Sequence, residues 1–555
     1  MLLRQNHFAS LALLFAASLP VPVMAQGSSE GAPGLDKVEV IQAAHHDHNF
    51  VLRDTKGAPF DPAYRKEAKE KRRVPYVDSP GFDFDHAAQL DHANSSRPFA
   101  LTTANPNLGG ATGLDGKGMG FNGMGAGFSG PAGAFTVQAA PPDTTGAVGA
   151  SQFVQWVNSS LTVFDKSTGA PVYGPVKGNT LFSGFGGACQ TSNDGDPVVL
   201  YDKLANRWVL MQFAVPTGGP YYQCIAVSKT SDATGGYDRY AFQYTGFNDY
   251  PKAGVWPDAY YVTYNMFTPN TFGGAEVCAM DRAKMLAGQA ATQQCFKLST
   301  SYGGLLPADL DGSIAPVSGT PNFVMNLGTN QLNLWKFHVD WSTPANSTFT
   351  GPTAIPVTAF NAACGGGTCV PQGGTKKLLD SLADRLMYRL AYRKFADGHE
   401  ALVVNHAVKV GSTSRSSYSA TRWYEIRNPS ATTPAVYQQS TYAPDATSRW
   451  MGSVAMDKVG NLALGYSASS GSIKPALRYA TRLAGDTVNT LSNETTIIQG
   501  GGAQTGTYSR WGDYSHMSID PVDDCTFWYT SEYLKADGTW NWSTRIASFK
   551  INGCQ

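Results

Sequence analysis

The chain of 555 residues contains a repeated segment whose second strand is strongly apolar or aromatic, and this repeat limits the folds that it can adopt. From about residue 140 onward, one plan recurs: a polar cluster, a short strand of small residues, a tight turn and a strongly apolar or aromatic strand. The clearest copy is RWGDY, SHMSIDP, VDD and CTFWYTSEY at 510–533, and a near copy is RWMG, SVAMD, KVGN and LALGYSAS at 449–469. Repetition at this scale indicates a fold built from similar units.

Seven copies of the plan can be aligned. Their first strands are predicted to begin near Thr144, Pro197, Lys252, Leu306, Leu386, Met451 and Tyr514. Most copies leave room for two further strands, and four strands per copy is typical of β-propeller blades. We therefore predict an all-β, seven-bladed β-propeller of four-stranded antiparallel blades. The last copy is one strand short, so a strand from the N-terminal side would close the ring; Phe135–Ala140 precedes the first copy and has no blade of its own. Two stacked β-sandwiches are the alternative.

The N-terminal quarter has a different composition. Residues 1–25 resemble a signal peptide, with Arg4 before a short apolar run and small residues up to Ala25; an uncleaved anchor is the alternative. Residues 26–104 are polar and are predicted to be a flexible extension or pro-segment, and 105–134 a Gly-rich linker. The propeller domain would span 135–555. No later segment is apolar for long enough to be a transmembrane helix. We expect a secreted or periplasmic protein.

The cysteines fit an oxidising compartment. There are eight, with no CxxC pair, and an even count in an exported chain favours disulfides over a zinc site. Sequence does not determine their connectivity. Pairing neighbours along the chain is the most economical arrangement: Cys189 with Cys224, Cys278 with Cys295, Cys364 with Cys369, and Cys525 with Cys554.

Charge limits the possible partners. The chain carries 42 Lys+Arg and 42 Asp+Glu, and this balance argues against a nucleic-acid partner, because such proteins usually present a basic face. A polysaccharide, or a glycan or protein of a cell surface, is the expected partner. We expect a monomer.

The polar clusters before the first strands are the candidate site, because in a propeller they gather at one rim of the central channel. Asp196, His406 and Asp513 are the catalytic candidates; His406 occurs once and imidazole transfers protons near neutral pH. Carboxylates, Arg and aromatic rings together suit a sugar. The substrate-binding candidates are Asp143, Asp194, Lys252, Arg385, Arg449, Trp450, Arg510, Trp511 and Tyr533. Loops after the second strands would add Tyr221, Tyr222, Phe267 and Glu532 to the same rim.

A structural role is the alternative for each of these residues. The Arg-Trp pairs at 449 and 510 repeat, as architectural residues do, and the Asp residues can cap turns. Cofactors are left unknown by the sequence. A structural Ca²⁺ could involve Asp311 or Asp523 and Asp524, although the spacing is not that of an EF-hand. The run His45-His46-Asp47-His48 could bind a metal.

Five segments resemble a group of uncharacterised exported bacterial proteins with β-propeller-like sequences. They are GDPVVLYDKLANRWVL, YPKAGVWPDAYYVTYN, LNLWKFHVDW, DRLMYRLAYR and RWGDYSHMSIDPVDDCTFWYTSEY. The resemblance covers roughly residues 135–554, and it implies the fold and the export but no reaction.

Two classes of function are consistent with these features. The first is a carbohydrate-active enzyme, a polysaccharide lyase or a glycoside hydrolase, with its site at the central channel. In it Arg449 or Arg510 would neutralise an acidic sugar, His406 or a tyrosine would move a proton, and a rim Asp would act as acid or base. The alternative is a non-catalytic extracellular propeller that binds a glycan or a protein. The sequence leaves open whether the protein is an enzyme.

Overall fold

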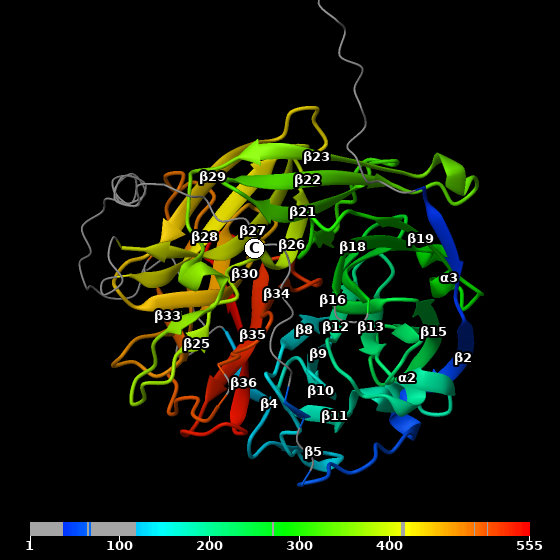
Figure 1. Cartoon of the computed structure of the whole chain (residues 1–555), viewed down its shortest axis with the longest axis horizontal. Helices are drawn as coiled ribbons and strands as arrows, with labels where there is room; N and C mark the ends of the chain where they lie inside the picture. Colours follow the sequence, from blue (N-terminus) through cyan, green and yellow to red (C-terminus); the bar gives the residue numbers. More distant parts are fainter. Residues whose placement is uncertain are drawn as a thin grey trace, which may run out of the picture. The chain divides into compact units, whose positions relative to one another are not determined.

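The computed structural model describes residues 37–63, 66–67, 118–268, 271–411, 417–492, 494–507 and 509–555, with only the backbone of 66–67. All of them belong to one compact unit, 34–555. The predicted signal peptide lies outside the described residues. The chain is all-β, as predicted, and its sheets are mostly antiparallel (Figure 1). Among the described residues, no helix has the length and apolar character needed to span a bilayer.

Each predicted copy of the repeat forms an antiparallel meander that starts at an inner strand. The first is β8 (Thr144–Val148), β9 (Gln152–Val157), β10 (Ser160–Asp165) and β11 (Pro171–Lys177). The second is β12 (Val198–Asp202), β13 (Arg207–Ala214), β14 (Tyr221–Ser228) and β15 (Gly236–Tyr244). The third is β16 (Phe247–Val255), β17 (Tyr260–Thr268), β18 (Thr271–Met280) and β19 (Thr292–Lys297).

The fourth and fifth meanders share one eight-stranded sheet. They are β20 (Leu306–Asp311), β21 (Asn322–Gly328), β22 (Gln331–His338) and β23 (Thr348–Pro356), then β26 (Met387–Lys394), β27 (Glu400–Val410), β28 (Tyr418–Arg427) and β29 (Ala435–Tyr442). The parallel pairing of β20 with β26 joins them. The sixth is β30 (Ser448–Met456), β31 (Leu462–Ser469), β32 (Ala476–Arg482) and β33 (Thr495–Ile498).

The seventh sheet draws on both ends of the sequence. It consists of β34 (His516–Ile519), β35 (Thr526–Leu534), β36 (Trp542–Lys550) and β4 (Gly120–Gly125). A strand from the N-terminal side therefore completes the last sheet, as predicted. It comes, however, from the segment 105–134 that we expected to be a linker. The end of Phe135–Ala140 instead forms β7 (Ala139–Ala140), which pairs with β3 (Lys66–Glu67).

β4 has a glycine where it lies against Gln155, a side chain of the first sheet. The Gln155 amide donates to Thr530 Oγ1 (2.8 Å) and Thr544 Oγ1 (3.0 Å) and accepts from the Met124 amide (2.8 Å). A Cβ on Gly123 would lie 2.5 Å from this amide group. The Gly-rich composition thus reflects a close approach between two sheets rather than a loose linker.

The described part of the predicted flexible extension also forms strands. β1 (Glu39–Gln42) adds a fifth strand beside β19, and β2 (His45–Val51) adds one beside β15. The side chains of β2 are used for packing: Asp47 accepts from Arg239 Nε (2.9 Å), and the His46 ring stacks on Tyr240 at 6.0 Å. The inferred metal-binding role of this segment finds no support in these contacts.

The inner strands follow one another in space. β8 contacts β12, β12 contacts β16, and so on through β20, β26, β30 and β34, which contacts β8 again. Figure 1 shows these strands toward the middle of the view, with β11, β23 and β33 farther out. Aromatic side chains fill the spaces between sheets; Trp156, Trp208 and Trp423 are fully buried.

The short helices and minor strands lie in the connections. They are η1 (Leu52–Asp54), η2 (Gly178–Phe182), α2 (Gly187–Thr191), α3 (Arg282–Leu286), η3 (Pro344–Asn346), η4 (Ala363–Gly366), and the strands β5 (Ser129–Gly130), β6 (Gly133–Ala134), β24 (Thr368–Val370) and β25 (Leu379–Asp380).

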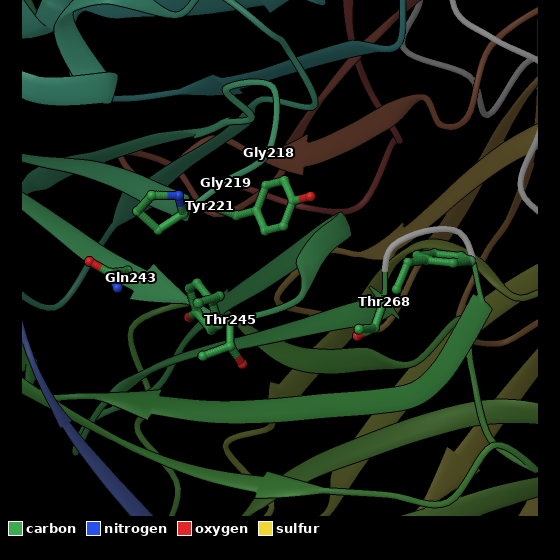
Figure 2. A pocket seen from close by; sticks show the side chains of 9 residues that line it. Gly218, Gly219, Tyr221, Gln243, Thr245 and Thr268 are labelled. Atoms are coloured by element: carbon green, nitrogen blue, oxygen red, sulfur yellow. The ribbon is translucent and has the colours of Figure 1, made fainter.

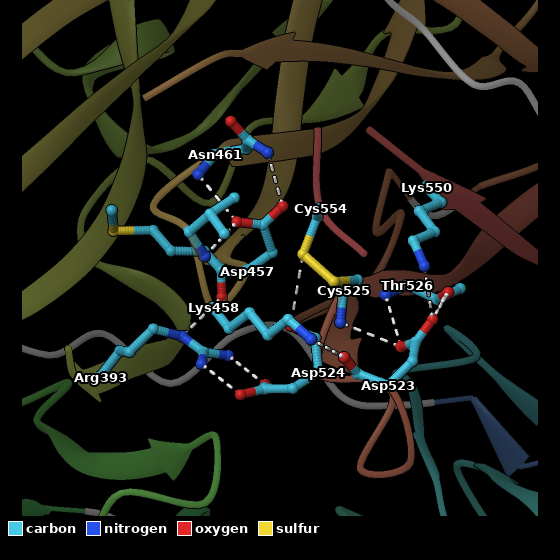
Figure 3. Close-up of a disulfide and its surroundings, with 12 residues drawn as sticks. Arg393, Asp457, Lys458, Asn461, Asp523, Asp524, Cys525, Thr526, Lys550 and Cys554 are labelled. Carbon is cyan, nitrogen blue, oxygen red and sulfur yellow. Dashed lines mark hydrogen bonds and ion pairs between the residues drawn. A yellow bond between two sulfur atoms is a disulfide. The ribbon is translucent and has the colours of Figure 1, made fainter. Parts of the chain in front are cut away.

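All four predicted disulfides are present: Cys189–Cys224, Cys278–Cys295, Cys364–Cys369 and Cys525–Cys554. Cys278 and Cys295 lie opposite each other on β18 and β19, as expected for adjacent outer strands. Figure 3 shows Cys525–Cys554, which joins the turn before β35 to the C-terminus. Four disulfides fit a protein of an oxidising compartment.

Candidate active site

Polar residues from five inner strands and one second strand meet at one end of these strands. We call them the central cluster: Asp143, Asp196, Lys252, Arg385, Arg510, Asp513 and Glu532. Five of them precede β8, β12, β26 or β34, whereas Lys252 lies within β16 and Glu532 lies near the end of β35. Six of the seven were expected at this rim as catalytic or binding residues, and Glu532 as a further rim residue.

Hydrogen bonds connect the members from the first and last sheets. The Asp143 carboxylate accepts from Asn158 Nδ2 and from the Asp513 backbone amide, both at 2.8 Å. Arg510 donates to the Asp513 carboxylate and forms an ion pair with it. The Asp513 side chain keeps 16% of its surface exposed, so it remains in reach of a ligand.

Aromatic rings hold the cations of the cluster. Lys252 Nζ lies 3.6 Å from the ring centroid of Tyr250 and 4.0 Å from that of Tyr514, and it donates to the Pro251 carbonyl at 2.9 Å. The Arg385 guanidinium carbon also lies over the Tyr250 ring, 4.5 Å from its centroid, and Arg385 pairs with Asp384 at 2.9 Å. Cation–π contacts of this kind stabilise desolvated cations. Neither tyrosine was among the predicted site residues; their position beside Lys252 and Asp513 in the repeat was the available signal.

The carboxylates of the cluster have different proton affinities. Burial, together with Asp249 and Asp513, raises the pKa of Asp196 to about 7, against the opposing effect of Lys252 and Arg510. Burial also raises the pKa values of Asp143 and Glu532. Burial opposes ionisation of Asp513 too, but the nearby Arg510, Arg385 and Lys252 outweigh it and lower its pKa. The cluster therefore places an Asp513 that ionises readily beside an Asp196 that holds its proton to higher pH.

The Lys252 ammonium is also poised near neutrality. Its burial, with 1% of the residue exposed, lowers its pKa to about 8, although Asp196, Asp513 and Asp143 favour the charged form. Groups with strongly shifted pKa values in one place are typical of catalytic sites.

Backbone strain coincides with the cluster. Asp143 and Asp196 both have φ of 44°, and Tyr250 has φ of 55°. This left-handed region is uncommon for residues other than glycine, although Asp tolerates it better than most. Asp143 and Asp196 precede inner strands, and Tyr250 lies within β16 at the irregularity between Asp249 and Lys252. At each position the left-handed backbone sets the direction in which the side chain leaves the chain.

Six of the predicted catalytic and binding residues are not part of the central cluster. His406 is fully buried in β27, donates to or accepts from Tyr424 OH at 2.9 Å through Nε2, and its pKa is lowered well below its usual value by burial and by Arg422. Arg449 is fully buried and pairs with Glu494 (2.9 Å) and Asp445 (3.0 Å). These contacts give Arg449 the structural role that we had weighed as its alternative.

Trp450, Trp511 and Tyr533 are also buried. The two indole rings pack against each other at 5.9 Å, and Tyr533 OH donates to Asn122 Oδ1 at 3.2 Å, on β4. Asp194 lies near the cluster but accepts from the Val215 amide at 2.7 Å, so it organises the loop after β13.

A long connection between β23 and β26 explains why Trp450 and Trp511 do not face a ligand. Ala363, Val370 and Leu382 of this connection belong to the same buried apolar group as the two tryptophans. Gln372 ties the connection to Gln504 through hydrogen bonds of 3.1 and 2.7 Å. We call residues 357–386 the covering segment. The Cys364–Cys369 disulfide lies within it.

The other end of the inner strands is held by ion pairs. Arg389 of β26 pairs with Asp309 (2.9 Å) and with Asp311, both on β20, and donates to the Met517 carbonyl of β34 at 2.8 Å. Lys203, just after β12, also pairs with Asp311. Asp311 therefore has two protein cations as partners, which is unlike a Ca²⁺ ligand.

The carboxylates of the second candidate Ca²⁺ segment, Asp523 and Asp524, also have protein partners. Arg393 holds both oxygens of Asp524 at 2.7 and 2.8 Å, and Asp523 accepts from the amides of Cys525 and Thr526 (Figure 3). Within the described residues, the group with metal-ligand types at suitable spacing is Glu276, Cys278 and Cys295, and both sulfurs are bound in a disulfide.

Comparisons with known proteins give no family. No family model matches the chain, and no curated protein matches it. Among solved structures, the chain is similar to an ulvan lyase of a new polysaccharide lyase family (11% identity, TM-score 0.34, 80% of this chain and 95% of that one). It is also similar to the WD40 domain of SCAP from fission yeast (7%, 0.31, 73% and 82%). A third is an exo-β-1,3-galactanase from Clostridium thermocellum (9%, 0.30, 78% and 99%). These TM-scores lie below 0.5, so we base no conclusion on them.

Proposed function

We propose that this chain is an exported glycoside hydrolase whose active site is the central cluster, at one end of the channel of a closed seven-bladed β-propeller. Two observations support the closed ring. The inner strands contact one another in a complete circuit from β8 to β34 and back to β8, and β4 completes the last sheet from the other end of the chain. In such a ring the central cluster lies around one mouth of the channel.

The observation that carries the enzymatic proposal is the pair Asp196 and Asp513, whose environments move their pKa values in opposite directions. Glycoside hydrolysis uses one protonated and one ionised carboxyl group. Asp196 would donate its proton to the leaving glycosidic oxygen as the bond from carbon to that oxygen breaks. Asp513 would act on the other side, as base toward water or as nucleophile toward the sugar carbon.

The ion pairs of Arg385 and Arg510 favour a hydrolase over a lyase. A lyase needs a cation to neutralise an acidic sugar, but Arg385 and Arg510 are already paired with Asp384 and Asp513. An acidic sugar would have to displace those carboxylates. The tyrosines beside the cluster, Tyr250 and Tyr514, keep their protons near neutral pH and so do not supply a base, because burial raises their pKa values.

The test is hydrolysis of a panel of neutral polysaccharides (glucan, galactan, arabinan, xylan) and acidic ones (alginate, pectate, ulvan) by the purified protein. We expect new reducing ends without unsaturated products. Asp196→Asn and Asp513→Asn should each lower the rate by about 10²–10⁴-fold, whereas the matched change Asp397→Asn, at a side chain that is 70% exposed, should not.

Other results would overturn the proposal in defined ways. Unsaturated products would establish a lyase instead. Retention of a polysaccharide without any product would establish the non-catalytic binding protein. Equal activity of Asp196→Asn and the parent would remove Asp196 from the reaction.

A further inference from the structure

A pocket of about 360 Å³ (Figure 2) lies within the range of about 300–1,000 Å³ that is usual for small-molecule sites. Its wall includes Gly218, Tyr221, Gln243, Thr245, Phe267 and Thr268. These residues come from the loop between β13 and β14, the end of β15 and the end of β17. All of its lining residues are uncharged.

The pocket combines an aromatic wall with neutral polar groups. Phe267 is 2% exposed and packs with Phe213 and Phe247, while the Tyr221 ring lies 5.7 Å from Phe247 and remains partly exposed. Gln243 and Thr245, which also line the pocket, are exposed. An aromatic face beside amide and hydroxyl groups matches a sugar ring, which has apolar C–H faces and hydroxyl edges.

A hydrogen bond and one strand connect the surroundings of the pocket to the central cluster. The Val215 amide donates to Asp194 Oδ2 at 2.7 Å, so the loop that leads to Gly218 is anchored two residues from Asp196. On the other side, Phe247 shares β16 with Lys252. Five residues of extended strand span at most about 17 Å, a distance that a short oligosaccharide can bridge.

The opposite side of the rim is closed. The covering segment, residues 357–386, packs over Trp450 and Trp511 and takes up the rim beside β30 and β34. The residues that line the pocket lie at β13, β15 and β17, outside the covering segment, so a substrate chain that leaves the central cluster in their direction would reach the pocket.

We infer that this pocket is a subsite for an uncharged sugar ring of the same polysaccharide chain whose bond lies at the central cluster. The inference rests on the proposed function. It adds the substrate class, a neutral glycan longer than a disaccharide. An acidic sugar is disfavoured here, because its charge would be desolvated beside an uncharged wall without a counter-ion.

The experiment uses Asp196→Asn as a binding-competent parent, so that substrate is not consumed. Binding of oligosaccharides from glucan, galactan, arabinan and xylan, and of alginate and pectate oligosaccharides as acidic probes, is measured by calorimetry. We expect the parent to bind a neutral oligosaccharide, and the added change Tyr221→Ala to weaken that binding at least tenfold. Tyr221→Phe, which keeps the ring, should stay within about threefold. The matched control is Tyr437→Ala, at an exposed tyrosine on β29 outside the pocket.

The outcomes separate this inference from the proposed function. Unchanged binding by Tyr221→Ala, tighter binding of acidic probes, or no binding of any neutral probe by a folded parent would overturn the subsite. Tyr221-dependent binding with no hydrolysis by the wild-type protein would keep the subsite and overturn the hydrolase. In an active wild-type background, Tyr221→Ala should raise KM for long substrates at least tenfold and leave short aryl glycosides unaffected.

Discussion

At the scale of single residues, the central cluster places more carboxyl groups together than its cations can neutralise. Asp143, Asp196 and Glu532 have raised pKa values, whereas Asp513 keeps its charge beside Arg510. The protonation of each group therefore depends on its neighbours, and changes of charge at one position should shift the behaviour of another.

The pH dependence of activity should report this coupling. If Asp196 is the proton donor, activity falls as pH rises through about 7, since the donor loses its proton. Lys252 lowers the pKa of Asp196, so Lys252→Met should move this decline to higher pH, and Lys252→Arg, which keeps the charge, should move it less. A pH–rate profile checks both, with thermal denaturation as the test of folding. A decline at the same pH in Lys252→Met would contradict the coupling.

Glu276 is a second buried carboxyl group, away from the cluster. Burial raises its pKa to about 7, so the folded protein binds a proton there that the unfolded chain releases above about 4.5. Its contribution to stability is therefore present at low pH and is lost as pH rises to about 7. In Glu276→Gln, the loss of unfolding free energy between pH 5 and pH 8 should be smaller by about 2 kcal/mol. Urea denaturation at both pH values measures it, and an unchanged pH dependence would show that Glu276 is ionised throughout.

At the scale of elements, β4 shows how a strand can depend on a side chain of another sheet. It pairs with β36 through Ser543, Arg545, Ile546 and Ala547, but its path along the first sheet is set by Gln155. The stability of β4 therefore depends on how closely its backbone can approach Gln155.

A Cβ at Gly123 should expose this dependence. Gly123→Ala places a carbon 2.4 Å from Thr544 Oγ1 and 2.5 Å from the Gln155 amide, and overpacking of this kind costs about 1–3 kcal/mol. Gly471→Ala, where a Cβ meets no atom within 4 Å, is the matched control. The difference in unfolding free energy by urea denaturation is the measurement, and equal stability of the two variants would mean that β4 adjusts freely.

Sequence patterns predicted the elements whose own residues carry the signal. The inner strands begin within a few residues of the predicted positions, because small and apolar residues alternate with turn residues around them. The disulfides could be paired because neighbouring cysteines lie on neighbouring strands. β4 could not be found, since glycine has no side-chain periodicity and the reason for it is Gln155, in another sheet. Trp450 and Arg449 looked like rim residues because only the folded chain shows what covers or pairs with them.

At the scale of the whole molecule, buried charges link sheets that are distant in sequence. Arg389 lies on β26 and connects β20 and β34 through Asp309, Asp311 and the Met517 carbonyl. Sequence analysis missed this group, because Arg389 falls inside an apolar strand pattern with no motif around it.

Removal of Arg389 should therefore destabilise the whole chain. Arg389→Leu leaves Asp309 and Asp311 buried without their main partner, and breaking a buried pair in this way costs about 3–5 kcal/mol. Arg53→Leu, at a side chain that is 54% exposed and paired with Asp232, should change stability by less than about 1 kcal/mol. Chemical denaturation of both variants is the measurement; similar stabilities would show that water or repacking compensates for Arg389.

The pairing of β4 with β36 has a consequence for the order in which the molecule is made. Residues 120–125 leave the ribosome well before their partners at 543–547, since Met124 and Thr544 are 420 residues apart. Until then, the edge of the seventh sheet that β4 will occupy does not exist. Contacts of such long range form slowly, so the seventh sheet can be completed only after residues 543–547 have been made, and until then residues 120–125 have no partner strand in it.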